Sequence, residues 1–260
     1  MPDQDQDQDQ DQADVVAERR PTQQAAAGSV IWARVDRGAR GPQPSLNRRR
    51  IARAAIEIAD AEGIDAVSMR KVAARLESGT MSLYRYLDRK DDLIDLMVDE
   101  VLGEGMRWAL SGDWRADLAE VARDIRRVTL RHPWLAGYAM GRPAFGPNLL
   151  RAIEHILAAV DGLGLDIDTM FDMWLTVSAF VNGYVLTELA EQEAQRRSGL
   201  TQEQFRARIA PYVRQIVESR QYPLFTRIIL EAEDFPDPDA VFERRLGYVL
   251  DGLPVPRSRR

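Results

Sequence analysis

Cysteine is absent from the 260-residue chain, which excludes a disulfide framework, a thiolate metal site and a cysteine nucleophile. Histidine is scarce: His132 and His155 are the two present, and neither has a carboxylate or a second histidine at metal-ligand spacing. The chain also lacks a glycine-rich phosphate loop and a nucleophile elbow around a serine. We therefore expect a protein that is not an enzyme and that holds no metal or cofactor.

Long apolar runs are missing as well. No stretch approaches the ~20 apolar residues that span a bilayer, and the acidic N-terminus does not fit a secretory signal. The alternation of apolar and polar residues that predicts strands is also absent. The sequence therefore predicts an all-α protein in the cytoplasm, with no membrane partner.

Charge is unevenly distributed along the chain, although its formal net value is −6. Residues 1–33 form an acidic tail whose Asp-Gln repeat, beginning at Asp3, offers nothing to bury, so we predict disorder there. Residues 34–45 form a basic arm, in which Arg37 and Arg40 are placed to lie along phosphates or enter a minor groove. The alternative is that this arm is a solvated linker.

The pattern in residues 68–87 predicts two short helices joined by a tight turn. Ser68 is a good N-cap for the first helix, and Thr80 is a candidate N-cap for the second. Leu83 and Leu87 fall four residues apart on the second helix, so both point inward. The side chains left facing outward are those of Thr80, Met81, Ser82, Tyr84, Arg85 and Tyr86.

This outward face suits a duplex groove, because hydroxyls and phenols bind phosphates and arginine reads guanine. The flanking residues support a helix-turn-helix. Upstream, residues 47–62 place apolar side chains at helical spacing, which predicts an amphipathic helix. Downstream, Asp91 and Asp92 favour the start of a long helix, where carboxylates complement the helix dipole. Residues 46–104 are therefore predicted to form a helical head.

The head, and above all residues 80–86 followed by 90–93, resembles the DNA-binding domain of TetR-type transcriptional regulators. The resemblance implies an all-helical homodimer, with an N-terminal three-helix head on operator DNA and a C-terminal ligand-binding and dimerisation domain. It assigns groove-facing roles to Thr80, Met81, Ser82 and Arg85, and backbone-contacting roles to Tyr84, Tyr86, Lys90 and Arg70.

One departure from that family lies in the turn of the helix-turn-helix. Where the family usually has Gly-Val, this chain has Glu77-Ser78, which loses a permissive residue and a small apolar plug. Glu77 also places a negative charge near DNA. We therefore expect a turn of different shape and weaker DNA binding than the motif alone suggests.

Residues 105–253 continue as helices and are predicted to form the effector-binding and dimerisation domain, while residues 254–260 should fray. The helices are expected at about 114–131, 148–163, 168–197, 201–220 and 238–250.

Aromatic residues gather in this second domain, where they favour either an ordinary core or a largely apolar effector cavity with few polar groups. For the cavity, Asn148 and Asn182 are candidates for orienting a ligand. The complete set of predicted effector-binding residues is Trp134, Met140, Phe145, Asn148, Phe171, Met173, Trp174, Ser178 and Asn182.

Two segments are candidates for a dimer interface. Residues 171–192 alternate large and small side chains, and residues 238–250 carry an apolar stripe that includes Phe242 and Leu246. The alternative is that both stripes face the core of their own domain.

These observations predict a homodimeric, sequence-specific DNA-binding transcriptional regulator. Its partners would be double-stranded operator DNA, a second copy of itself and an unknown small-molecule effector. We expect a repressor that a small, mostly apolar effector releases from its operator. Two alternatives are a helical protein-interaction protein that retains a helix-turn-helix remnant, and a DNA binder or activator that needs no effector.

Overall fold

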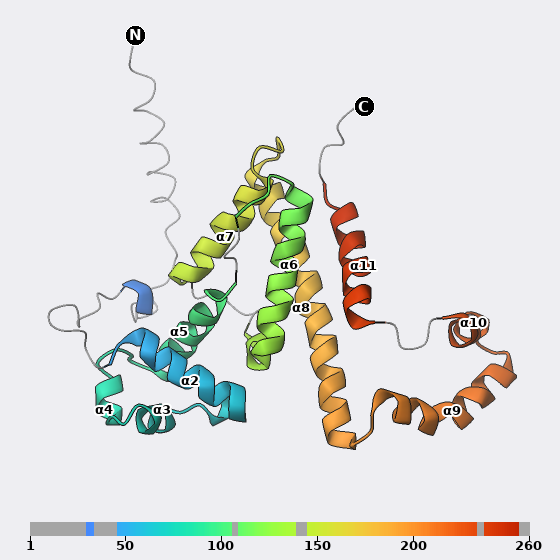
Figure 1. Ribbon diagram of the computed structural model, residues 1–260, viewed down its shortest axis with the longest axis horizontal. Coiled ribbons are helices and arrows are strands. Elements are labelled where there is room, and N and C mark those ends of the chain that lie inside the picture. Colours follow the sequence, from blue (N-terminus) through green and yellow to red (C-terminus); the bar gives the residue numbers. More distant parts are fainter. Residues whose placement is uncertain (1–29, 34–45, 106–108, 139–144, 233–236, 255–260) are drawn as a thin grey trace, which may run out of the picture. The chain divides into compact units, whose positions relative to one another are not determined.

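A computed structural model describes residues 30–33, 46–105, 109–138, 145–232 and 237–254 (Figure 1). Within these ranges the regular elements are α-helices and short 3-10 helices, and no strand occurs, as predicted. The elements are η1 (Ile31–Ala33), α2 (Arg48–Glu62), η2 (Ile64–Ala66), α3 (Met69–Arg75), α4 (Thr80–Leu83), α5 (Lys90–Leu102), α6 (Trp114–Arg131), η3 (Pro133–Gly137), α7 (Pro147–Val160), α8 (Ile167–Ser198), α9 (Gln202–Ser219), α10 (Pro223–Glu231) and α11 (Pro238–Asp251).

Several predictions fall on residues outside those ranges. They are the acidic tail up to residue 29, the basic arm 34–45 with Arg37 and Arg40, the effector candidate Met140 and the last residues of the chain. The end of the predicted disordered tail differs from expectation, because Ile31–Ala33 form a single 3-10 turn in which Ile31 is buried.

The head is built from α2, α3, α4 and α5. The side chain of Asn47 caps α2 by accepting a hydrogen bond from the N–H of Arg50 at 2.8 Å. Ser68 caps α3 as predicted, accepting from the N–H of Lys71 at 3.3 Å. Helix α2 packs against α5, and both bury apolar side chains completely. Side-chain caps and the apolar packing of α2 against α5 therefore contribute to the structure of the head.

The second domain is a bundle of α6, α7, α8 and α11. The predicted start of α6 is confirmed, because the side chain of Asp113 accepts hydrogen bonds from the N–H groups of Arg115 and Ala116. Helices α6 and α8 lie side by side (Figure 1, green and yellow-orange) and share one apolar core with α7 and α11. The largest contributors to that core include Leu118, Ile156, Met173, Phe242 and Leu246.

Helix α10 was not expected from the sequence. It follows α9 after three residues and begins with Pro223. Proline suits the first helical position because its φ is already helical and because an N–H there would have no partner within the helix. Its apolar residues Leu224, Phe225, Ile228 and Ile229 recur at helical spacing, so the pattern that predicts an amphipathic helix was present in the sequence and was overlooked. Neither α9 nor α10 buries a side chain completely. Helix α9, expected at about 201–220, begins with a reciprocal capping box formed by Thr201 and Gln204.

Helix α5 links the head to the second domain through Asp99. Its buried carboxylate accepts hydrogen bonds from the N–H groups of Asn148 and Leu149, each at 3.0 Å, at the start of α7. The amide of Asn148 returns a hydrogen bond of 2.9 Å to the carbonyl oxygen of Asp99. Helix α7 has no side-chain cap of its own, since Gly146 stands at its N-cap. A carboxylate on α5 therefore caps α7.

Candidate nucleic-acid interface

The turn between α3 and α4 has the geometry of a Schellman motif. The N–H of Ser78 donates to the carbonyl of Ala73 at 2.9 Å, and the N–H of Glu77 donates to the carbonyl of Ala74 at 3.1 Å. Glu77 has φ of 52° and so occupies the left-handed position where glycine is preferred. The hydroxyl of Ser78 is buried without a hydrogen-bond partner in the described structure. The turn thus keeps the motif's geometry while carrying two unfavourable residues.

We expect Glu77→Gly to stabilise the protein, because the left-handed conformation costs a non-glycine residue about 1 kcal/mol or more. That gain corresponds to a rise in Tm of roughly 2–4 °C for a domain of this size. Glu77→Ala is the matched control, since it removes the carboxylate but keeps the strained conformation. Thermal unfolding of both variants checks the prediction, and equal Tm values for Gly and Ala would contradict it.

Residues 80–87, which comprise α4 and the turn after it, carry the side chains that were predicted to face outward. Leu83 and Leu87 are completely buried, whereas 76% of Met81 is exposed and Tyr84 and Arg85 are also exposed. The remaining predicted contacts, Thr80, Ser82 and Tyr86, are half-buried. Because the packing role falls to the leucines, the exposed side chains are available to bind.

Helix α4, the second helix of the helix-turn-helix, differs from the prediction in two details. Thr80 is its first helical residue rather than its N-cap, and Gly79 at the N-cap supplies no side-chain hydrogen bond. The α-helix ends at Leu83, and residues 84–86 form turns, although the N–H of Leu87 still bonds to the carbonyl of Leu83 at 3.1 Å. A helix this short depends on the buried leucines for its position.

Basic side chains of the head fall into two groups. Arg49 and Arg53 both donate to the carboxylate of Glu100 at 2.9 Å, which ties α2 to α5. Lys71 and Arg75 likewise pair with glutamates of α2.

The second group is Arg70, Arg85 and Lys90, which are exposed and form no ion pair with any described residue. Lys90 is the first residue of α5, where no side chain caps the helix and backbone N–H groups favour an anion. All three were among the predicted DNA contacts, and their exposure leaves them accessible to a ligand.

The predicted effector residues are not gathered in one place. Trp134 is buried and donates its indole N–H to Asp60 on α2, and Asn148 is engaged by Asp99 on α5. Met173 belongs to the apolar core, while Phe145 is exposed.

Three of the predicted effector residues lie together on α8. The rings of Phe171 and Trp174 meet edge to face at 5.1 Å, and the nearby hydroxyl of Ser178 is buried with no hydrogen-bond partner in the described structure. Asn182 lies one turn further along α8 and is half-buried. Phe171, Trp174 and Ser178 are therefore the predicted effector residues that lie close to one another in the structure.

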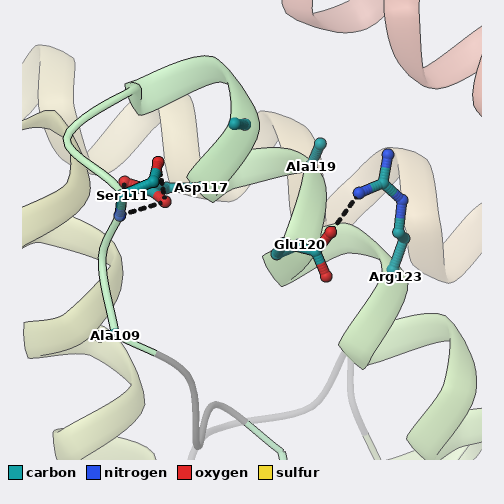
Figure 2. A pocket seen from close by; sticks show the side chains of 7 residues that line it. Ala109, Ser111, Asp117, Ala119, Glu120 and Arg123 are labelled. Carbon is teal, nitrogen blue, oxygen red and sulfur yellow. Dashed lines mark hydrogen bonds and ion pairs between the residues drawn. The ribbon is translucent and has the colours of Figure 1, made fainter.

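A hollow of about 300 Å³ lies at the start of α6 (Figure 2). Its lining is polar on one side, where Asp117 accepts hydrogen bonds from the backbone N–H and hydroxyl of Ser111. Burial opposes ionisation of Asp117, but these hydrogen bonds outweigh it and lower the pKa of the carboxyl. None of the predicted effector residues lines the hollow, whose complete lining is Ala109, Ser111, Ala116, Asp117, Ala119, Glu120 and Arg123.

The two predicted dimer stripes behave differently. The stripe of α11 faces the core of its own domain, because Phe242, Leu246 and Leu250 are buried among residues of α6, α7 and α8. The prediction that this stripe forms a dimer interface is therefore wrong. By contrast, α8 exposes a row of large and small side chains on the face opposite its core residues. The row consists of Phe171, Leu175, Ala179, Gly183, Leu186 and Ala190.

The described ranges contain no cluster of three or more acidic or histidine side chains able to hold a metal ion. In the same ranges, no helix is both long and apolar enough to cross a membrane.

Comparison with known proteins accounts for both domains. Residues 51–97 match bacterial regulatory proteins of the tetR family, and residues 110–256 match the tetracyclin repressor-like C-terminal domain. The chain belongs to the TetR family. It is thus a DNA-binding transcriptional regulator, and its helix-turn-helix head is the DNA-binding part.

Two TetR-family relatives are informative. The chain is 38% identical over 234 residues to the HTH-type transcriptional repressor DrrR1 of Streptomyces coeruleorubidus, covering 89% of this chain and 86% of the relative. The crystal structure of the Streptomyces coelicolor TetR family protein ActR in complex with actinorhodin is similar at a TM-score of 0.66. That comparison has 30% sequence identity and covers 80% of this chain and 95% of ActR.

Sequence reasoning missed three residues that join the two domains of this TetR-family chain, namely Asp60, Asp99 and His132. Each contact joins residues far apart in the sequence, so no local pattern reveals it. His132 was the one sequence signal for such a contact. It lies at the end of α6 and is buried, and a buried histidine needs hydrogen-bond partners.

Proposed function

We propose that this chain is a homodimeric repressor that binds a near-palindromic operator through α3 and α4 and is released by a small, mostly apolar effector. The observation that carries the DNA assignment is the division of residues 80–87 into buried leucines and exposed Met81, Tyr84 and Arg85. The repressor assignment is supported by the name of DrrR1. The effector assignment is supported by the complex of ActR with actinorhodin.

The operator can be selected from a pool of random duplexes with the full-length protein. Arg85→Ala should weaken binding to the selected operator by about 1–3 kcal/mol and reduce its preference over single base-pair variants, because Arg85 is expected to read a base edge. Fluorescence anisotropy on operator and variant duplexes measures both effects. Equal loss on every sequence would instead mean that Arg85 contacts phosphate alone.

Lys90→Ala is the matched control, because it also removes one exposed cation of the head. We expect it to lower the slope of log affinity against log salt by about one counterion while leaving sequence preference unchanged. If the random pool yields no operator at all, the helix-turn-helix is a remnant and the proposed function fails.

The dimer is proposed to form through the exposed face of α8. Its alternating large and small side chains permit close helix approach, and a two-fold axis would set the same row of each copy against the other. Two-fold symmetry also places the two recognition helices about one turn of B-DNA apart, roughly 34–36 Å. A dimer would then read two half-sites with one protein.

The effector is proposed to bind beside Phe171, Trp174 and Ser178 on α8. The aromatic pair offers apolar surface, and the unpartnered hydroxyl offers one hydrogen bond to orient a ligand. Actinorhodin is the first probe, because it occupies ActR. Its affinity should fall when operator DNA is bound, by the same factor by which it weakens operator binding. Identical affinities with and without operator would favour an effector-independent DNA binder.

A further inference from the structure

A buried histidine joins the head to the effector domain. His132 ends α6 and is 2% exposed, and its Nδ1 lies 2.8 Å from Oδ1 of Asp60 on α2. The indole N–H of Trp134 donates to that same oxygen at 2.8 Å. One carboxylate oxygen of the head therefore accepts hydrogen bonds from two buried side chains of the effector domain.

The other side of His132 is also occupied. Its Nε2 lies 3.3 Å from Oε2 of Glu104, which follows α5 and pairs with Arg131 at 3.1 Å. The rings of His132 and Trp134 meet edge to face at a centroid distance of 6.1 Å. Packing and hydrogen bonds thus fix the imidazole between the ends of α2 and α5.

The position of Asp60 on its helix argues that this contact is not incidental. Asp60 lies in the last turn of α2, where the helix dipole disfavours a carboxylate. Its two hydrogen-bond donors offset that cost, since bonds to a charged acceptor are stronger than neutral ones. Asp60 therefore destabilises α2 when that helix is considered alone, and the hydrogen bonds from His132 and Trp134 offset this cost only when the effector domain is packed against the head.

We propose that Asp60 is a positioning residue that fixes the orientation of the head on the effector domain and so sets the half-site spacing that the dimer accepts. This inference rests on the proposed operator binding. Inserting one base pair between half-sites moves one of them by about 3.4 Å and rotates it by roughly 34–36°. A head held by His132 and Trp134 cannot follow that movement, whereas a released head can.

The orientation can be measured without DNA, because a chain that lacks cysteine accepts two spin labels cleanly. Ala74 on α3 and Ala158 on α7 are both exposed, so spin labels can be attached to the variants Ala74→Cys and Ala158→Cys. Double electron–electron resonance then gives the distribution of distances between the two labels. Excess unlabelled protein limits each dimer to one labelled chain. We expect a narrow distribution for the parent chain and a clearly broader one for Asp60→Ala.

Three further variants separate positioning from folding. Asp60→Asn keeps an acceptor oxygen and should retain the narrow distribution, whereas Trp134→Phe loses one donor and should broaden it partly. Asp65→Ala removes a different exposed carboxylate of the head and should change nothing. A distribution for Asp60→Ala as narrow as that of the parent chain would overturn the proposal.

Operator spacing provides the second readout. The parent protein should discriminate strongly between the selected operator and the same operator with one central base pair inserted. In Asp60→Ala that discrimination should fall by about tenfold, which corresponds to about 1.4 kcal/mol. Unchanged discrimination together with an unchanged distance distribution refutes the role of Asp60 and leaves the proposed function intact. Failure to select any operator refutes the proposed function, while the distance measurement still decides the role of Asp60.

Discussion

Gly183→Glu should convert the protein to a monomer and weaken operator binding by roughly 10²–10⁴-fold, the range that simultaneous engagement of two sites contributes. Gly183 lies in the exposed row of α8, and a Cβ there would meet no heavy atom within 4 Å beyond its sequence neighbours and the backbone of its own helix. The substitution is therefore compatible with the fold of one protomer and removes a helix-destabilising glycine. In the proposed dimer it places a carboxylate in a closely packed interface, twice by symmetry.

Sedimentation velocity at micromolar concentration measures the change of mass, and anisotropy measures the loss of operator binding. Ala158→Glu is the matched control, because it adds the same charge to an exposed position of α7 and should remain dimeric. A dimeric Gly183→Glu protein would exclude the outer face of α8 as the interface. A monomeric protein that still binds the full operator with parental affinity would show that two half-sites are not needed.

Asp99→Ala should cause the largest loss of stability among single substitutions in the link between the domains. It leaves the N–H groups of Asn148 and Leu149 without their acceptor, at a cost of about 2–4 kcal/mol in the free energy of unfolding. Urea unfolding measures this loss as a lower midpoint at constant slope. A loss below about 1 kcal/mol would mean that other groups satisfy the two donors.

Asp99→Asn is the informative control, because its amide oxygen can still accept both hydrogen bonds. Burial raises the pKa of the Asp99 carboxyl, although hydrogen bonds from the N–H groups of Leu149 and Asn148 oppose that effect. A folded carboxyl that holds its proton more strongly than the unfolded one makes stability fall as pH rises above the ordinary carboxyl value. Asp99→Asn should retain most of the stability and lose this pH dependence.

The starts of helices were predictable from the sequence, because a capping side chain acts on N–H groups two or three residues away. Ser68 was expected to cap a helix and does so, and Asp113 and Thr201 cap the helices expected at about 114–131 and 201–220, whereas Thr80 is the first residue of α4 and not its cap. The buried pair Leu83 and Leu87 followed from helical spacing in the same way. Local chemistry therefore predicted the position of the second helix and its buried leucines, but not its exact bounds.

Features that depend on contacts between distant residues were not predictable. Periodicity identified the apolar stripe of α11 but not its partner, which is the core of its own domain. Similarly, Trp134 and Asn148 have the chemistry of ligand-binding residues, yet Asp60 and Asp99 engage them from the head. The sequence contains the hydrogen-bonding groups, but only the packing of helices decides which of them meet.

The cap that α5 supplies to α7 has a consequence for cooperativity in unfolding. Because the acceptor for the first turn of α7 belongs to α5, unfolding the head exposes unsatisfied donors in the effector domain. The free energy of opening either domain alone is raised by the same contact, so partly unfolded forms become less populated. The boundary between the domains is a functional division, whereas the segments on either side of Asp99 are expected to unfold together, because they share these hydrogen bonds.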